Sequence, residues 1–363
     1  MTSKITQRIL RELAGQNLHT ALSSDLPLSD LQSLLLDVYD SRAQHTGAAN
    51  LLARTAAHSL FTHSSASARL MNQFDGIAFE TAAGFEAIDL SPVCTLGASY
   101  TLGGTSQKNL LTTIRNAESL GDSTIAMAIE CARRRRPKLG SRDAAEVRLC
   151  ASHRVVRLQP FDVPGFTPHF RLFAMVTAGR DAGSLEFEHR HLREHLEFYL
   201  RLMRKLNEKG FAFEAPIVEI TDLDAAEAAL TARGVTREEI REAVRAHRPG
   251  ESERLLAKHE IALPTDLREV EGALAILDRQ VMQPLRAVFP EAEFRFNAAR
   301  LEGLGYYSRF ALRISPRTRD GHRFALIDGG FTDWTARLLS NKKERLLISG
   351  MGTELACKAY AGQ

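Results

Sequence analysis

Apolar and polar residues alternate in two neighbouring stretches near the middle of the chain, residues 152–157 and 170–176. Both stretches are rich in β-branched and aromatic side chains, which is typical of strands. The segment between them contains Pro160, Pro164, Gly165 and Pro168. Because these residues interrupt regular structure, the pattern predicts two strands joined by a long, stiff loop.

Apolar residues recur at helical spacing through much of the remaining first half. The spacing predicts helices over residues 5–13, 31–38, 48–79, 122–132 and 186–206. The period changes to two over residues 85–93, so a strand is expected to follow the long helix and to stop at Pro92. A short strand is also expected over residues 109–114.

The second half of the chain separates into a charged, helical part and a part made of strands. Residues 222–290 predict helices punctuated by glycine and proline, and strands are expected at residues 294–297, 301–308, 310–314, 324–330 and 346–355. We therefore divide the chain into an N-terminal helical segment (1–47), a first core part (48–210), a helical insertion (211–290) and a second core part (291–363). The expected fold class is α+β, with an antiparallel sheet of about six strands flanked by helices.

Composition excludes several classes of protein. The 363 residues are 44% hydrophobic and 25% charged, and a net charge of +3 gives no strong electrostatic case for nucleic acid. The four cysteines (Cys94, Cys131, Cys150 and Cys357) have no CxxC spacing and are expected to be reduced. No run approaches the roughly 18 apolar residues of a membrane span, and residues 1–15 do not look like a signal peptide. We therefore expect a cytoplasmic protein without a membrane partner.

Two groups of ionisable side chains have a plain structural explanation. The four arginines at 133–136 end a predicted helix, where basic residues favour the negative end, so we expect a solvated cap. His189, His191 and His195 lie on the helix predicted over residues 186–206. A spacing of two does not bring two imidazoles to one face, so we expect surface histidines and no metal site.

The two central strands carry the candidate chemistry. Arg157, His169 and Arg171 lie at their ends, and Phe173 follows two residues after Arg171, on the same face of its strand. Guanidinium groups hold phosphate oxygens, and a base can stack on an aromatic ring, so this set indicates a nucleotide-binding site. The alternative interpretation is a β-hairpin with a few solvated basic residues.

This arrangement resembles motif 2 of the class II aminoacyl-tRNA synthetases, with Val156-Arg157, a loop, and then His169-x-x-x-Phe173. The resemblance implies that Arg157 holds the α-phosphate of ATP and that Phe173 stacks on adenine. Thr177 departs from the pattern, because the family usually has an acidic residue there. The predicted long helix and the strand that ends at proline are similar to motif 1, which implies a homodimer.

Further stretches are similar to the histidyl-tRNA synthetase branch. An Arg-x-Glu element in that branch contacts the amino acid, and the resemblance makes Arg115 and Glu118 its counterparts. Residues 302–307, 329–333 and 350–354 are similar, in order, to an Arg-Gly-Leu-Asp-Tyr-Tyr signature, a Gly-Gly-Arg-Tyr-Asp turn and motif 3. The ligand contacts implied are Tyr306, Tyr307 and Asp333, and the implied nucleotide contacts are Gly350 and Gly352.

Departures from these signatures bear on activity. Glu302 stands in place of an arginine, Gly305 of an aspartate, Phe331 and Thr332 of arginine and tyrosine, and Leu355 of the arginine that clamps the γ-phosphate. Removing such a donor costs about 3 kcal/mol or more by analogy with an oxyanion hole, so ordinary histidine activation is not expected. Because the sequence ends at Gln363, an anticodon-binding domain and charging of tRNA are not expected either.

Two functions of different classes remain. In the first, the protein is a ligand-binding or regulatory subunit similar to that of ATP phosphoribosyltransferase, with a catalytic partner subunit. In the second, it is an ATP-dependent ligase that forms the adenylate of an amino or carboxylic acid for a small-molecule or carrier-protein acceptor. Arg157 would then neutralise charge at the α-phosphate, and Glu302 would bind an amino group or a metal. The expected cofactor is ATP, with or without Mg²⁺.

Overall fold

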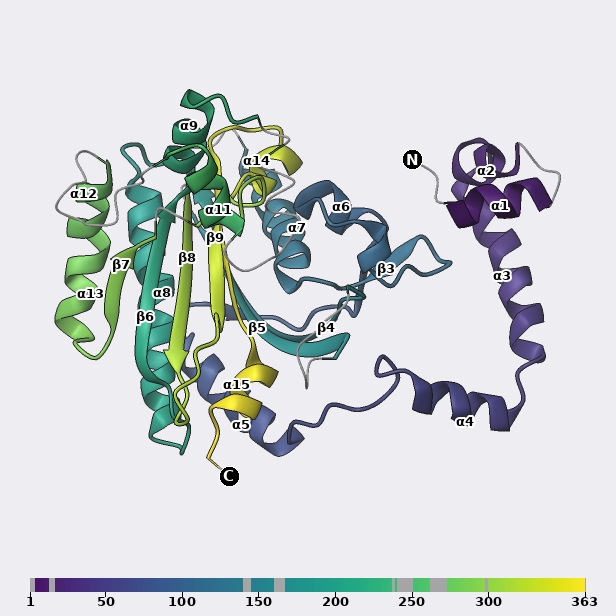
Figure 1. Cartoon of the computed structure of the whole chain (residues 1–363), viewed down its shortest axis with the longest axis horizontal. Helices are drawn as coiled ribbons and strands as arrows, with labels where there is room; N and C mark the ends of the chain where they lie inside the picture. Colours follow the sequence, from purple (N-terminus) through teal and green to yellow (C-terminus); the bar gives the residue numbers. More distant parts are fainter. Residues whose placement is uncertain are drawn as a thin grey trace.

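The computed structural model describes residues 4–12, 17–139, 145–159, 167–236, 239, 251–261, 273–297 and 300–362. At its centre, an eight-stranded sheet has the spatial order β1-β4-β5-β10-β9-β8-β6-β7 (Figure 1). The strands in that order are β1 (Glu86–Ala87), β4 (Val147–Val156), β5 (His169–Arg180), β10 (Glu344–Met351), β9 (Ile327–Thr332), β8 (Phe310–Arg317), β6 (Glu214–Asp222) and β7 (Glu293–Phe296).

The predicted antiparallel sheet is confirmed, with eight strands instead of about six. Only the outermost pairs are parallel, β1 with β4 and β6 with β7. Within this sheet, the strand that the sequence did not predict is β6, which pairs antiparallel with β8. It lies within residues 211–290, so the range expected as a helical insertion begins with a strand of the sheet. The strand expected over residues 301–308 was wrong, because these residues form turns.

The register of the central strands decides which side chains share a face of the sheet. Ala174 of β5 lies opposite Ala151 of β4 and Gly350 of β10. Cross-strand partners point to the same side, so these small residues together leave one face open. Phe173 precedes Ala174 and therefore points to the other face.

Helices cover both faces of the sheet. On the Phe173 face lie α5 (Ala68–Thr81) and α8 (Glu186–Asn207), whose apolar residues pack with Phe173, Met175 and Leu347. On the other face lie α6 (Ala98–Gly103), α7 (Ser123–Arg135) and α14 (Trp334–Leu338), around the buried Trp334. The helix α15 (Thr353–Ala359) directly follows β10.

A small two-stranded sheet precedes α7. It is made of β2 (Val93–Thr95) and β3 (Ala117–Ser119), with the 3-10 helix η2 (Gln107–Asn109) between them. The strand expected over residues 109–114 was wrong, because this segment continues from η2 as irregular chain. A second 3-10 helix, η3 (Arg136–Lys138), follows α7.

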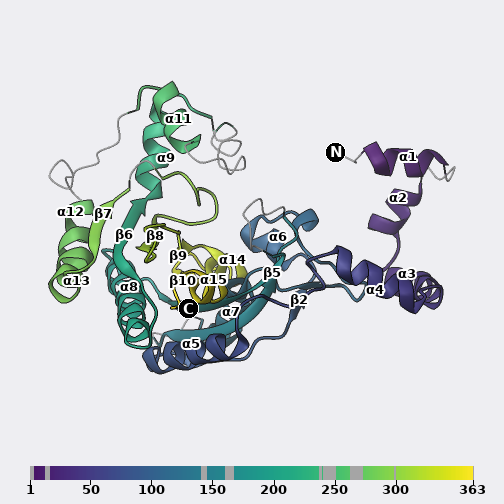
Figure 2. The same cartoon turned by 60° about the horizontal axis from the view of Figure 1, so that its bottom comes forward.

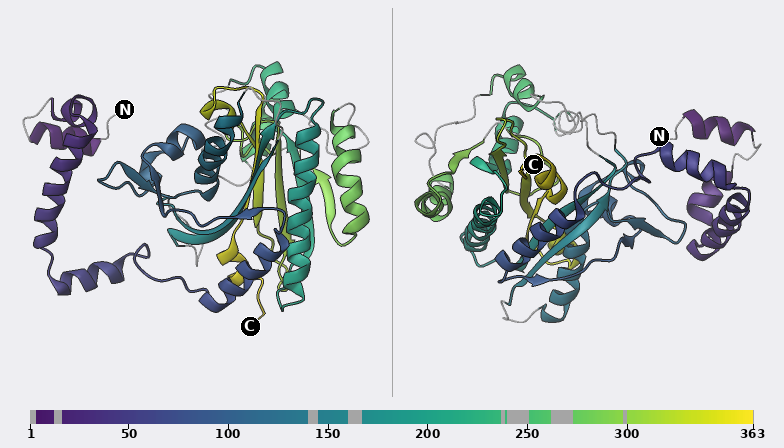
Figure 3. Two further views of the ribbon diagram at one scale, coloured as in Figure 1. Left: turned by 180° about the vertical axis from the view of Figure 1, so that it is seen from behind. Right: turned by 90° about the horizontal axis from the view of Figure 1, so that it is seen from below.

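The N-terminal segment forms a helical arm that stands away from the sheet (Figures 1 and 3). It consists of α1 (Lys4–Glu12), α2 (Leu18–Thr20), the π-helix η1 (Ala21–Asp25), α3 (Leu28–Gln44) and α4 (Ala48–Ala57). None of these helices has a buried residue. The single helix predicted over residues 48–79 is instead two, α4 in the arm and α5 on the sheet.

The helices between β6 and β8 lie at the opposite side of the molecule from the arm (Figure 2). They are α9 (Leu223–Ala232), α11 (Glu251–Lys258), α12 (Ala273–Leu277), the π-helix η5 (Asp278–Met282) and α13 (Gln283–Val288). Among the residues that the structure describes, no helix is both long and apolar enough to cross a bilayer.

Two expectations for ionisable groups were wrong. His189, His191 and His195 of α8 are buried, because this helix packs against the sheet on one side and against η5 on another. Arg135 is only 3% exposed and is paired with the equally buried Glu344 of β10. The basic end of α7 is therefore only partly a solvated cap.

Candidate functional site

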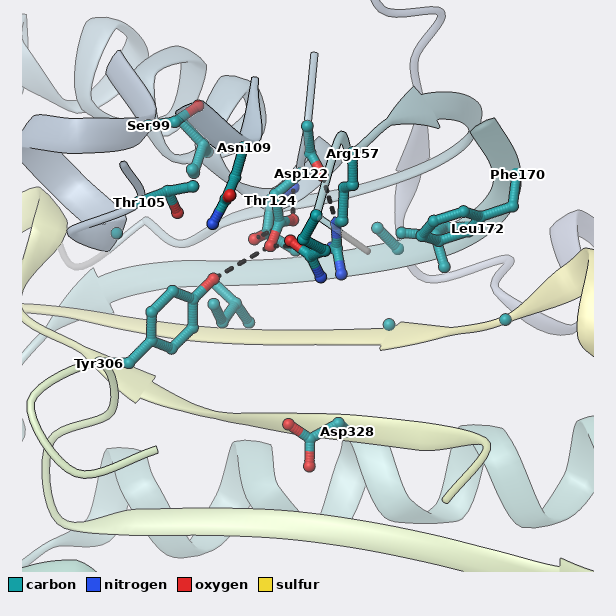
Figure 4. Close-up of a pocket in the computed structure, with 18 of the residues that line it drawn as sticks. Ser99, Thr105, Asn109, Asp122, Thr124, Arg157, Phe170, Leu172, Tyr306 and Asp328 are labelled. Atoms are coloured by element: carbon teal, nitrogen blue, oxygen red, sulfur yellow. Dashed lines mark hydrogen bonds and ion pairs between the residues drawn. The ribbon is translucent and has the colours of Figure 1, made fainter. Parts of the chain in front are cut away.

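A large cavity opens on the α7 face of the sheet. Its volume is about 1480 Å³, and residues from both core parts of the chain line it. The walls come from α6, the start of α7, the end of β4, the start of β5, the turn at residues 303–307, and the junction between β10 and α15. Figure 4 shows Ser99, Asp122, Arg157, Phe170 and Tyr306 from these walls. Ala174 and Gly350 form part of the floor. Larger side chains at these two paired positions would fill the space above the sheet.

Arg157 directly follows the last residue of β4 and points into this cavity (Figure 4). Its Nε donates to the carbonyl oxygen of Gly121 at 2.7 Å, which fixes the guanidinium plane. The guanidinium carbon is 5.4 Å from the centre of the Phe170 ring, within the range of a cation–π contact. The predicted cation is thus in the cavity, and the aromatic ring beside it is Phe170.

Asp122 joins three elements of the site. As the N-cap of α7, its carboxylate accepts from the backbone nitrogen of Thr124 at 2.9 Å, which is the usual role of aspartate at this position. The Tyr306 hydroxyl donates to Asp122 at 3.0 Å, and Arg157 lies 3.7 Å away (Figure 4). Burial, reinforced by the neighbouring carboxylate, raises the pKa of Tyr306 well above its usual range. Tyr306 therefore stays a neutral hydrogen-bond donor.

A second carboxylate, Asp328 of β9, lines the same cavity. It accepts from the Tyr307 hydroxyl at 2.9 Å and from Nη2 of the buried Arg300 at 2.7 Å. Burial and Asp328 together raise the pKa of Tyr307 well above its usual range. Gly330 makes room for the Tyr307 ring, because a Cβ there would lie 2.7 Å from a ring carbon.

The far end of the cavity is formed by α15. Glu354 accepts from the Ser64 hydroxyl at 2.6 Å and pairs with Arg154 at 3.0 Å and with Lys358 at 2.9 Å. Leu355 also lines the cavity, so this end offers an apolar side chain at the position compared above with the γ-phosphate clamp. Gly352 lines it too.

Three of the predicted nucleotide contacts lie on the wrong face of the sheet. His169 contacts Arg154 and the carbonyl oxygen of Thr62, and Arg171 donates to Asp75 at 2.6 Å. Phe173 is fully buried. Its ring packs between the rings of Phe79 and Phe198, at centroid distances of 5.3 and 5.6 Å. The predicted stacking of a base on Phe173 was therefore wrong, because the residues of β5 that face the cavity are Phe170, Leu172 and Ala174.

Four further predicted residues do not line the cavity. Arg115 is exposed in a turn, while the buried Glu118 accepts from the backbone nitrogens of Gly97 and Ser99 at 2.9 Å each. Glu118 therefore holds the start of α6. Asp333 is 60% exposed at the start of α14, 3.5 Å from Arg337. Glu302 has a carbonyl oxygen that accepts from Arg300, but its side chain is not part of the wall.

The sequence did carry signals for two residues that we did not predict in the site. Asp122-Ser123-Thr124 at a helix start is a capping pattern, and such a cap next to Arg157 could have been considered a ligand contact. Phe170 precedes Arg171 in the same strand, and alternation alone makes it the partner of Leu172. Asp328 had no such signal, since only the pairing of β8, β9 and β10 brings it to the cavity.

Comparison with known proteins gives a fold and no sequence family. No protein-family model and no curated protein matches the sequence. An ATP phosphoribosyltransferase regulatory subunit/histidyl-tRNA synthetase from Bacillus halodurans superposes with a TM-score of 0.56 and 12% identity, over 80% of this chain and 78% of that chain. A histidine–tRNA ligase subunit from Alicyclobacillus acidocaldarius has a TM-score of 0.59 and 13% identity, over 82% and 94%.

A third similar structure is apo histidyl-tRNA synthetase from S. aureus, with a TM-score of 0.51 and 13% identity, over 80% of this chain and 69% of that chain. The superpositions establish the fold. Because the sequence identities are this low, the residues of the cavity must be judged by their own geometry. The chain therefore has the fold of a class II synthetase core of the histidyl-tRNA synthetase type.

Proposed function

We propose that this chain binds a nucleotide and a small amine-bearing ligand, does not charge tRNA, and acts as a regulatory subunit. The observation that carries the proposal is the composition of the cavity wall, which keeps Arg157 but presents Leu355 at the α15 end. Transfer of an adenylate needs positive charge where negative charge develops on the departing phosphates. Leu355 cannot supply it, and Lys358 on the same helix is already paired with Glu354 at 2.9 Å, so binding fits this cavity better than turnover does.

The amine-bearing ligand is inferred from Asp122. A carboxylate at a helix N-cap that also accepts from the Tyr306 hydroxyl is held in one orientation. Such a fixed carboxylate suits an ammonium group, because the charge-assisted hydrogen bond is stronger than a neutral one. A free amino acid is the simplest ligand with this group.

The proposal is tested by thermal unfolding with each of the common amino acids, because a ligand of the folded state raises the apparent stability. We expect at least one amino acid to raise the midpoint, and Asp122→Asn to weaken its binding about tenfold. Asparagine is also a good N-cap, so this variant keeps α7 while it loses the charge. A matched carboxylic acid without the amino group should bind both proteins equally weakly. No shift with any amino acid would contradict an amino-acid ligand.

A partner subunit is part of the proposal, since one of the similar structures is named as an ATP phosphoribosyltransferase regulatory subunit. Co-expression with a short-form ATP phosphoribosyltransferase should give a complex whose activity exceeds that of the catalytic chain alone. The amino acid that binds this chain should change that activity, and Asp122→Asn should reduce its effect. An unstimulated catalytic chain, or two proteins that never associate, would contradict this partner.

An ATP-dependent ligase is the second candidate function, and the position of Arg157 in the cavity favours it. In that function ATP, carried with Mg²⁺, would place its α-phosphate on Arg157 while a bound carboxylate attacks. Exchange of labelled pyrophosphate into ATP, stimulated by one amino or carboxylic acid and abolished in Arg157→Ala, would support the ligase. Absence of exchange together with measurable ligand binding would favour the regulatory function.

We also propose that the protein is a homodimer, in which the arm of residues 4–57 covers a second copy. Large apolar residues on the arm are exposed: Ile5, Leu28, Leu34, Val38, Tyr39, Leu51 and Leu52. Exposed apolar residues that gather on one segment are typical of a contact between chains.

A further inference from the structure

We propose that the cavity selects a nucleoside monophosphate over the corresponding di- and triphosphate. This inference rests on the proposed nucleotide site and adds the number of phosphate groups that the site accepts. It follows from the charges that line the cavity, from the geometry of one guanidinium, and from the apolar end at α15.

The wall of the cavity is short of positive charge. Among the described residues that line it, two are basic (Arg157 and Lys358) and three are acidic (Asp122, Asp328 and Glu354), a formal balance of minus one. Both basic side chains lie beside a carboxylate, Arg157 at 3.7 Å from Asp122 and Lys358 at 2.9 Å from Glu354. Arg154 and Arg300 also pair with two of these carboxylates, Glu354 at 3.0 Å and Asp328 at 2.7 Å. A second or third phosphate group would therefore have to compete with a wall carboxylate for its cation.

The loop that follows Arg157 cannot correct this shortage. Residues 158–168 read LQPFDVPGFTP, with one aspartate and no lysine, arginine or histidine. Whatever conformation the loop adopts, it adds no side-chain cation to a bound polyphosphate.

Arg157 can hold one phosphate group. Its Nε is occupied by the carbonyl oxygen of Gly121, and its Nη2 lies 3.7 Å from Asp122, which is longer than a hydrogen bond, so the terminal nitrogens can still donate to a ligand. Two parallel N–H···O bonds from one guanidinium match the oxygens of a single phosphate. A monophosphate places its whole charge at this fork, while a triphosphate carries most of its charge beyond it.

The remaining walls suit the uncharged part of a nucleotide. Phe170 places an aromatic ring next to the fork, and base stacking on such a ring tolerates any base. At the α15 end, Leu355 and Ala359 line the cavity with hydrocarbon, and the ammonium group of Lys358 is paired with Glu354 at 2.9 Å. A second or third phosphate that reached this end would therefore lose water and gain Lys358 only by displacing Glu354.

Calorimetric titration of the full chain with AMP, ADP and ATP, each with and without Mg²⁺, tests the inference. We expect AMP to bind at least tenfold more tightly than ATP in either condition. Adenosine alone and inorganic phosphate alone should each bind at least tenfold more weakly than AMP, because the ring and the fork contribute together. Equal or tighter binding of ATP would overturn the inference, and so would inorganic phosphate that binds as well as AMP.

Three variants sharpen the experiment. Arg157→Lys keeps the charge but not the fork, and should weaken AMP about tenfold or more. Leu355→Arg adds the absent cation, and should narrow the difference between ATP and AMP by improving ATP. Arg133→Ala removes an arginine that is 72% exposed on the outside of α7, and should change neither affinity. If Leu355→Arg left the ratio of AMP affinity to ATP affinity unchanged, this would count against a selection based on charge.

The possible failures can be told apart. If ATP binds as tightly as AMP, the selection for a monophosphate is wrong while the nucleotide site stands. If no nucleotide binds but an amino acid still raises the unfolding temperature, the nucleotide part of the proposed function fails and this inference fails with it. If neither class of ligand binds, the proposed function as a whole is wrong.

Discussion

Tyr307 shows how single residues shape the cavity. Its ring rests on two glycines, Gly303 and Gly330, where a Cβ would approach ring carbons to 2.6 and 2.7 Å. At Gly330 the carbonyl oxygen of Phe310 is a further obstacle at 2.9 Å, and backbone cannot rotate away. The contact between Tyr307 and Asp328 therefore depends on glycine at these positions.

Gly330→Ala should lower the free energy of unfolding by about 1–3 kcal/mol, because the added methyl overpacks a fixed ring and a carbonyl group. Gly76→Ala is the matched control. Gly76 lies exposed within α5 with no atom within 4 Å of its would-be Cβ, so alanine should stabilise by about 0.5–1 kcal/mol. Urea unfolding of both variants measures the two effects. The same sign of change in both would contradict this account of Gly330.

At the scale of elements, the arginines at the end of α7 look equivalent in the sequence but differ in burial and in partner. Arg133 is 72% exposed and pairs with Glu130 of its own helix. Arg135 is 3% exposed, donates to Glu344 of β10 at 3.0 Å through Nη2, and donates to the carbonyl oxygen of Ala145 at 2.7 Å. This one arginine therefore ties α7 to the sheet that forms the floor of the cavity.

Arg135→Ala should cost about 3–5 kcal/mol of unfolding free energy, since it leaves the buried carboxylate of Glu344 without its partner. Arg133→Ala should change stability by less than about 0.5 kcal/mol, as is usual for an exposed pair. Chemical denaturation of the two variants measures both changes in unfolding free energy. Equal, small effects would mean that the pairing of Arg135 with Glu344 is not maintained in solution.

The helix α8 buries an imidazole in the core of the molecule. His195 is fully buried between the Thr177 hydroxyl at 2.9 Å and the Ser349 hydroxyl at 2.8 Å. Desolvation, helped by the nearby His191 and Arg148, lowers its pKa well below the usual 6.5. The folded protein therefore holds His195 neutral at a pH where the unfolded chain would protonate it.

Because the pKa is lower in the folded state, His195 contributes stability that is present above pH 6.5 and is lost as the pH falls towards the folded pKa. The loss is about 1.4 kcal/mol per pH unit below the unfolded pKa. We expect urea midpoints to fall between pH 7 and pH 5.5, and His195→Gln to fall less over the same interval. His322→Gln, at a position 72% exposed, is the control and should follow the wild type. If the urea midpoint of His195→Gln fell as much as that of the wild type, His195 would not be the source of this pH dependence.

At the scale of the whole molecule, the arm is the part without a core of its own. It contacts the body through Asn116, whose side-chain amide donates to the carbonyl oxygen of Leu28 at 3.4 Å. Its apolar residues remain uncovered, and exposed apolar surface of this extent marks a contact with another chain. The proposed second copy would cover it.

Leu51→Glu combined with Leu52→Glu should convert the dimer into a monomer, because both side chains are more than half exposed and charge would oppose their burial in the partner. Ile276→Glu, on α12 of the body, is the control and should remain dimeric. Sedimentation velocity of the full chain over a range of concentrations measures the mass. A wild-type protein that stays monomeric throughout would contradict the role of the arm.

The sequence by itself determined the type of most elements and the antiparallel class of the sheet, because alternation and helical spacing report which side chains must leave water. Five of the residues that it suggested, Arg157, Tyr306, Tyr307, Gly350 and Gly352, line the cavity. It could not place Phe173, His169 and Arg171, since the face of a strand is fixed by its register with neighbours, and a change of one residue reverses it. Nor could the sequence show that Asp328 lies at the cavity or that Arg135 is buried. The partners of these two residues lie far away in the sequence and come into contact only when the sheet is assembled.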